Sequence, residues 1–226
     1  MKTGLTLEQL AAEITRQQSA KEDYVVNTGN LRLESYGPDL TLRVLDSDGA
    51  DRIEPLEIGD IAHRQIGTHL SIPAKYYERM RSEDPGLLAH NVNTWLERTP
   101  AQRMIRVLDG KARAYLSNRY LRMDNYSIAS AVLPILAEIP DVRIESCQIT
   151  DSRMYIKAVN PRLQEDVTPG DTVQAGVVIS NSEVGLGSVN IQPLIYRLVC
   201  SNGMVVNDAA TKRNHIGRAT DAEENF

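Results

Sequence analysis

The sequence predicts an α+β protein, in which an N-terminal β/helical lobe precedes an antiparallel sheet meander with a packed helix. Apolar residues recur at helical spacing after Thr6 and after Asp124, and polar and apolar residues alternate along segments such as 111–116. Turn-forming pairs such as Asp109-Gly110 separate the alternating segments. The 226 residues, 42% of them hydrophobic, suffice to bury a core in one large domain or two small ones.

Composition narrows the class of protein further. No run approaches the roughly 18–20 apolar residues of a membrane span, and the N-terminus lacks the apolar core of a signal peptide. With Cys147 and Cys200 as the only cysteines, a disulfide framework is implausible. We therefore expect a soluble, cytoplasmic protein with no membrane partner.

The first part of the chain begins with a helix. Thr6 and Gln9 have the spacing of a capping box, and Leu7, Leu10 and Ile14 follow at helical spacing. Three segments then show strand composition or alternation, and a fourth is a weaker candidate: 24–26, 31–33, 40–44 and 53–58.

Residues 58–98 carry helical patterns. Ile72-Pro73 interrupts them, because a residue before proline avoids the α region, and residues 87–96 form a separate short helix. The pattern ends before Thr99-Pro100. We place a seam near Pro100, so residues 1–100 form the β/helical lobe and residues 101–226 the sheet core with a polar C-terminal tail.

The second part opens with a hairpin of strands 103–108 and 111–116 and continues with a helix over 125–138 that contains Pro134. A loop containing Pro161 and Pro169 interrupts the later strands. We expect those strands at 142–150, 153–159, 173–181, 188–200 and 204–206.

Charge is distributed unevenly. The net charge is −5, yet the segment from Arg103 to Arg122 holds six cations and one carboxylate. A basic stripe with tyrosines suits single-stranded nucleic acid, since arginine binds phosphate and tyrosine stacks on bases. The alternative is that these side chains decorate a solvated sheet. The nucleic-acid candidates in this stripe are Arg103, Arg106, Arg113, Tyr115, Asn118, Arg119, Tyr120 and Arg122.

Two later segments are also rich in polar groups. The turn 180–188 offers Asn181, Ser182, Glu183 and Gly185 to a ligand, although the pattern favours a hairpin with polar turn residues. Further cations could reach phosphate near the C-terminus, unless they belong to a solvated tail. They are Arg197, Lys212, Arg213 and His215.

Known catalytic and metal-binding patterns are missing from the sequence. His63 and His69 are six residues apart, which does not place two ligands on one helix face, and neither Cys-x-x-Cys nor His-Glu-x-x-His occurs. Residues 61–73 superficially resemble a helix–turn–helix, but acidic neighbours favour a packed helical hairpin. We assign no catalytic residue, metal or cofactor, and lean against an enzyme.

Several runs resemble a family of phage- and plasmid-like proteins of unknown function, over roughly residues 55–218. They are 87–96, 113–120, 124–125, 180–185 and 196–204. The resemblance implies work on nucleic acid or against host defence, and an architecture similar to phage single-strand annealing proteins, which use no nucleotide and assemble into oligomers. Members of the family are commonly longer, which implies a continuation beyond Phe226.

The expected function is therefore binding or annealing of single-stranded DNA in recombination or replication, by a protein of a mobile genetic element. Two alternatives remain. One is a small-ligand binder or enzyme at the turn 180–188, with Glu183 and His215 as an acid/base pair if the fold brings them together. The other is a counter-defence protein that binds a host protein. We also expect that copies of this chain associate into a homo-oligomer.

Overall fold

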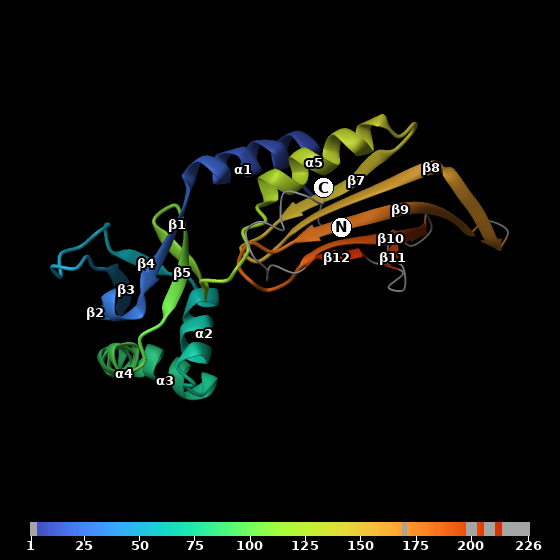
Figure 1. Ribbon diagram of the computed structural model, residues 1–226. Helices are drawn as coiled ribbons and strands as arrows, with labels where there is room; N and C mark the ends of the chain where they lie inside the picture. The colour runs from blue at the N-terminus through green and yellow to red at the C-terminus, as the bar shows by residue number, and fades with distance from the viewer. Residues whose placement is uncertain (1–3, 169–170, 198–202, 206–210, 214–226) are drawn as a thin grey trace. The chain divides into compact units, whose positions relative to one another are not determined.

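A computed structural model describes residues 4–168, 171–197, 203–205 and 211–213, and it confirms the α+β class (Figure 1). The chain folds into two compact units. Residues 20–120 form one, here called the insert unit. Residues 1–19 and 121–226 form the other, the flanking unit, so that one unit is inserted into the sequence of the other.

The insert unit contains a six-stranded sheet in the order β1-β5-β6-β4-β3-β2, with β4 and β6 parallel and the other pairs antiparallel. The strands of this unit are β1 (Lys21–Asn27), β2 (Leu31–Tyr36), β3 (Asp39–Val44), β4 (Leu56–Ile58), β5 (Gln102–Leu108) and β6 (Lys111–Ser117). A 3-10 turn, η1 (Thr28–Asn30), joins β1 to β2.

The expected hairpin around Asp109-Gly110 is confirmed as β5 and β6, and both turn residues have the positive φ that a tight hairpin turn needs. The seam, however, does not fall at Pro100. All seven residues of β1 pair with β5, from Lys21 opposite Leu108 to Asn27 opposite Gln102. The hairpin therefore completes the sheet of the first part, and the units divide after Ser19 and after Tyr120.

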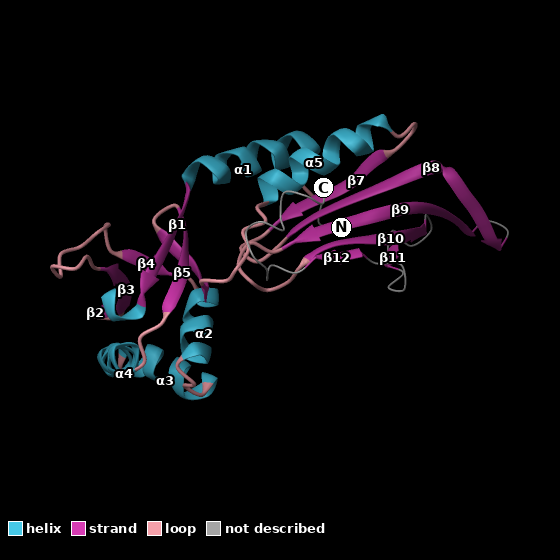
Figure 2. Cartoon of the chain, in the orientation of Figure 1, coloured by secondary structure: helices cyan, strands magenta, loops and turns pink. Residues whose placement is uncertain are grey.

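Three helices cover one face of this sheet: α2 (Asp60–His69), α3 (Ala74–Glu83) and α4 (Pro85–Arg98) (Figure 2). Pro73 separates α2 from α3, as the sequence predicts. Asp84 caps α4 by accepting a hydrogen bond from the Leu87 amide at 2.9 Å, and Pro85 occupies the first turn, where no amide donor is needed. Leu88, Val92 and Leu96 of α4 enter the core at helical spacing.

The flanking unit confirms the predicted antiparallel meander with a packed helix. Its sheet has the order β11-β10-β9-β8-β7, and β12 also pairs with β10. Helices α1 and α5 lie along one face of this sheet (Figure 1). The elements are α1 (Leu7–Ala20), α5 (Asn125–Glu138), β7 (Arg143–Ile149), β8 (Met154–Thr168), β9 (Asp171–Asn181), β10 (Val189–Arg197), β11 (Gly203–Val205) and β12 (Thr211–Arg213).

Local signals explain how these elements begin. The capping box of α1 is confirmed: Thr6 N donates to Gln9 Oε1 at 2.9 Å, and Gln9 N donates to Thr6 Oγ1 at 3.1 Å. Leu10 and Ile14 then meet Ile128 and Ala129 of α5 in the core above the sheet. Pro134 lies inside α5.

The prediction of a loop around Pro161 is wrong. Strand β8 continues to Thr168, and its pairing with β9 shifts register between Asn160 and Gln164. A bulge leaves a residue out of the ladder, so a proline without an amide donor is tolerated there. Among the described residues, no helix is long and apolar enough to span a membrane.

Candidate functional site

The predicted basic stripe includes one arginine that lies in the interior. Arg106 on β5 has an exposed fraction of 0%. Its Nε and Nη2 atoms lie 2.9 and 3.1 Å from the two carboxylate oxygens of Asp23 on β1, directly opposite in the sheet. A guanidinium that is enclosed and bidentately paired cannot meet a phosphate, so Arg106 is a structural residue.

Tyr115 on β6 is also buried and does not offer a stacking face. Its hydroxyl lies 2.8 Å from His69 Nδ1, and its amide donates to Gln65 Oε1 at 2.7 Å. The Arg103 guanidinium lies over its ring, 5.7 Å from the centroid. Burial raises the pKa of Tyr115, and the positive charge of Arg103 offsets only part of that rise, so the phenol is neutral at physiological pH.

The remaining members of the stripe lie nearer the surface. Arg113 is half-buried on β6, whereas Asn118 and Arg119 are exposed in the loop that follows, and Tyr120 is half-buried. Arg122 is exposed but belongs to the flanking unit. Within the stripe, Arg103 and Tyr115 lie in contact.

The turn after β9 is buried against the start of α5. We call the buried polar residues of this contact the latch: Asn125, Asn181, Ser182 and Glu183. Asn181 is 1% exposed, and its Nδ2 donates to Met123 O and Asn125 Oδ1, both at 2.9 Å. The Asn125 amide, the first of α5, donates to Glu183 Oε1 at 2.6 Å. A carboxylate thus satisfies an orphan amide at the positive end of the helix.

The rest of this turn also bonds within the protein. The Leu186 amide donates to Ser182 Oγ at 3.1 Å, and the Arg153 guanidinium donates to the Leu186 carbonyl. Gly185 has a φ of 76°, which a glycine adopts without strain. Of the residues that the sequence offered to a ligand, Asn181 and Glu183 therefore fasten β9 to the start of α5, and Ser182 stabilises the turn itself.

The predicted C-terminal cations lie at the edge of the described residues. The structure gives the backbone of Arg197 in β10 and of Lys212 and Arg213 in β12, where Lys212 pairs with Asn190 and Arg213 with Val189. His215 and its expected pairing with Glu183 lie outside the described residues. In the described ranges, no group of three or more His, Cys, Asp or Glu side chains could hold a metal ion.

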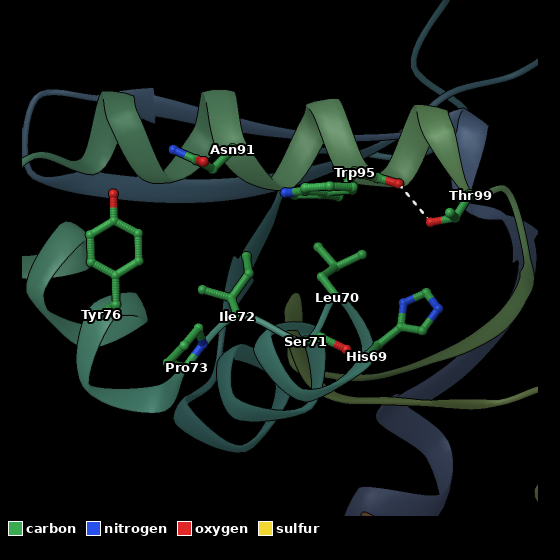
Figure 3. Close-up of a pocket in the computed structure, with 9 residues that line it drawn as sticks. All are labelled: His69, Leu70, Ser71, Ile72, Pro73, Tyr76, Asn91, Trp95 and Thr99. Carbon is green, nitrogen blue, oxygen red and sulfur yellow. Dashed lines mark hydrogen bonds between the residues drawn. The ribbon is translucent and has the colours of Figure 1, made fainter.

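A groove that the sequence did not mark lies in the insert unit, between α4 and the connection from α2 to α3. Its volume is about 600 Å³, and Figure 3 shows its lining. We call it the α4 groove, and its lining residues are His69, Leu70, Ser71, Ile72, Pro73, Tyr76, Asn91, Trp95 and Thr99. Burial and the charge of Arg103 lower the pKa of His69, so the lining carries no charge at neutral pH.

Two aromatic side chains in this groove face solvent. Trp95 is 42% exposed and Tyr76 is 47% exposed. In Figure 3 the indole lies edge-on above Leu70 and Ile72, with Tyr76 and Asn91 toward one end and His69 and Thr99 toward the other. The Arg98 guanidinium lies 5.4 Å from the centroid of the indole, a cation–π arrangement.

Most charged side chains of α3 and α4 form ion pairs. Glu83 pairs with Arg79 at 2.8 Å and Glu97 with Arg32 at 3.0 Å, whereas Arg81 is shared between Asp60 at 2.8 Å and Glu78 at 3.5 Å. Among the described residues, the exposed cations Lys75 and Arg98, next to Tyr76 and Trp95, have no carboxylate partner. Two cations without a carboxylate partner therefore lie next to the exposed aromatic residues at the rim of the groove.

The sequence held one signal for this groove. Leu88, Val92 and Leu96 form the buried stripe of α4, and Trp95 lies one position off that stripe. The helical period thus places a large aromatic ring at the border of the buried face. Its partners from the α2–α3 connection become visible only when the helices pack.

Comparison with known proteins finds that part of the chain is similar to a domain family of unknown function. Residues 114–225 match the model of a domain of unknown function, DUF932. No curated protein and no solved structure matches the chain. The matched residues run from within β6 through β12, so most of this similarity lies in the flanking unit and the α4 groove lies outside it.

Proposed function

We propose that this protein binds single-stranded nucleic acid, with the α4 groove as the site where a base stacks. One observation carries the proposal: Trp95 exposes its indole in an uncharged groove while Arg98 lies against the ring. Stacking of a base on an aromatic side chain contributes about 1–3 kcal/mol, and nearby cations attract the phosphates.

The distribution of charge supports a nucleic-acid ligand over an apolar one. An uncharged lining suits a nucleobase, and the unpaired cations at the rim, Lys75 and Arg98, suit the phosphates on either side of that base. A single strand fits better than a duplex, because the faces of paired bases are covered by their neighbours in the stack.

The proposal keeps the function expected from the sequence and moves its site. The buried Arg106 and Tyr115 are replaced by Arg98, Trp95 and Tyr76 as the groups that meet the ligand. We extend the proposal to annealing in recombination or replication of a mobile element, since annealing requires that both strands first be held unpaired.

The test is fluorescence anisotropy with a labelled single-stranded oligonucleotide and the matching duplex, at low and moderate salt. We expect the single strand to bind more tightly, with an affinity that falls as salt rises. Trp95→Ala should weaken binding roughly 5- to 150-fold, the equivalent of one stacked base.

Tyr36→Ala is the matched control, since Tyr36 is an exposed aromatic of the same unit that does not line the groove. It should bind as the unaltered protein does. If the unaltered protein binds and Trp95→Ala binds equally well, the site is elsewhere. If the unaltered protein binds no oligonucleotide, the function itself is wrong.

A further inference from the structure

A chain of three side chains ends at the α4 groove: Arg103 on β5, Tyr115 on β6 and His69 at the end of α2. Arg103 lies over the Tyr115 ring, 5.7 Å from its centroid, and the phenol oxygen lies 2.8 Å from His69 Nδ1. His69 also lines the groove. We call this arrangement the relay, and the direction of its hydrogen bond follows from the burial of Tyr115.

The burial of Tyr115 fixes where the phenol proton points. Burial raises the pKa of Tyr115, so the hydroxyl keeps its proton. A buried hydroxyl proton needs a hydrogen-bond acceptor, since leaving it unsatisfied is costly. Among the described residues, the partner of the hydroxyl is His69 Nδ1, which therefore accepts that proton.

The third member then presents a donor. Burial, followed by the charge of Arg103, lowers the pKa of His69, so its imidazole carries a single proton at neutral pH. Because Nδ1 accepts a hydrogen bond, that proton lies on Nε2. Within the described part of the chain, Nε2 has no hydrogen-bond partner and is not enclosed.

We infer that the relay makes His69 Nε2–H a fixed donor that selects bases with an exocyclic oxygen over bases with an exocyclic amino group. This inference rests on the proposed function and adds the substrate class to it. The exocyclic group meant here is the one at position 4 of a pyrimidine or position 6 of a purine, placed opposite His69 Nε2. Thymine and uracil carry the acceptor O4 and guanine the acceptor O6, whereas cytosine and adenine carry an amino donor there. A donor facing a donor leaves both unsatisfied, so the amino bases bind less tightly.

Oligo-dT and oligo-dC of equal length test the selection, because both are pyrimidine strands with the same backbone and charge. We expect the unaltered protein to bind oligo-dT about 3- to 10-fold more tightly at neutral pH, the effect of one hydrogen bond. His69→Phe keeps an aromatic ring and removes the donor. It should bind both strands with nearly equal affinity.

A second measurement examines the relay without any nucleic acid. Nitrogen NMR of the histidine rings, with the His69 signals assigned from His69→Phe, reports which nitrogen carries the proton. We expect the Nε2–H form in the unaltered protein and a mixture of both forms in Tyr115→Phe. Tyr76→Phe is the control, because Tyr76 lines the groove without being part of the relay, and it should leave the tautomer unchanged.

The outcomes separate the two proposals. Tight binding of both strands with equal affinity overturns base selection and leaves single-strand binding intact. An Nδ1–H or doubly protonated His69 overturns the relay, whatever the oligonucleotides do. Binding of neither strand overturns the proposed function, and base selection with it.

Discussion

The latch of the flanking unit and the α4 groove of the insert unit use their side chains in opposite ways. Asn181 and Glu183 are buried, and their polar atoms bond to the start of α5. Trp95 and Tyr76 are apolar rings that stay partly in solvent. A dense polar motif can thus serve the fold alone, because buried polar groups must be satisfied, whereas an exposed aromatic cluster indicates a binding surface.

The largest effect that separates interior from surface should come from the buried ion pair. Asp23→Ala removes the bidentate carboxylate partner of the enclosed Arg106, which should lower the free energy of unfolding by about 3–5 kcal/mol. Chemical denaturation followed by the fluorescence of Trp95, the single tryptophan, reports on the insert unit. Glu83→Gln, which breaks the exposed pair with Arg79, is the control and should have a far smaller effect.

The next effect concerns pH. His63 is 2% exposed, its Nδ1 lies 2.9 Å from the Tyr77 hydroxyl, and burial, followed by the charge of Arg81, lowers its pKa to about 4. The unfolded chain therefore binds the proton more readily, so His63 should reduce stability as pH falls from about 6.5 to about 4, by up to about 3 kcal/mol.

Denaturation of the unaltered protein and of His63→Gln across this range measures that contribution. Glutamine can still hydrogen-bond to Tyr77 but does not titrate, so the difference between the two stability profiles should shrink toward acidic pH. A difference that stays constant would show that His63 does not titrate in this way.

A smaller effect is expected at the latch. Glu183→Ala removes the acceptor for the first amide of α5 and should lower the free energy of unfolding by about 1–2 kcal/mol. Glu183→Gln retains an acceptor oxygen and should lose less than half of that. Circular dichroism follows the transition, and oligonucleotide affinity in native buffer should be unchanged, because the latch serves the fold.

The smallest effect on stability is expected in the groove. Tyr76→Ala removes a ring that is 47% exposed and should change the free energy of unfolding by less than about 1 kcal/mol. The same variant should bind a single-stranded oligonucleotide measurably less tightly. A large loss of stability with unchanged affinity would make Tyr76 a packing residue and would reverse the contrast with the latch.

Signals between near neighbours in the sequence predicted much of the fold. The Thr6–Gln9 capping box, the turn at Asp109-Gly110 and the break at Pro73 each depend on a few adjacent residues. The pairing of β1 with β5 depends on residues about 80 positions apart, and no local pattern contains it. The seam was therefore expected at Pro100, although the sheet continues beyond it.

The candidate site was harder to predict for the same reason. From the sequence alone, Arg106 is expected to be a surface cation. Its burial depends on the ion pair with Asp23, which lies 83 residues away in the sequence. The sequence likewise suggests that Tyr115 could stack on a base, whereas in the structure its ring is buried and its hydroxyl is hydrogen-bonded to His69. Trp95 could be placed at the border of the buried stripe of α4, but the α2–α3 connection that completes the groove required the packed structure.

The path of the chain through the two units bears on how the protein is made. Helix α1 leaves the ribosome before the insert unit, but the partners of this N-terminal segment lie far downstream: Leu5 bridges to Cys147, and Leu10 packs with residues of α5. All strands and helices of the insert unit are synthesised between these partners. During translation the groove can therefore assemble before the sheet that packs against α1 is synthesised, and the flanking unit is completed after the insert unit.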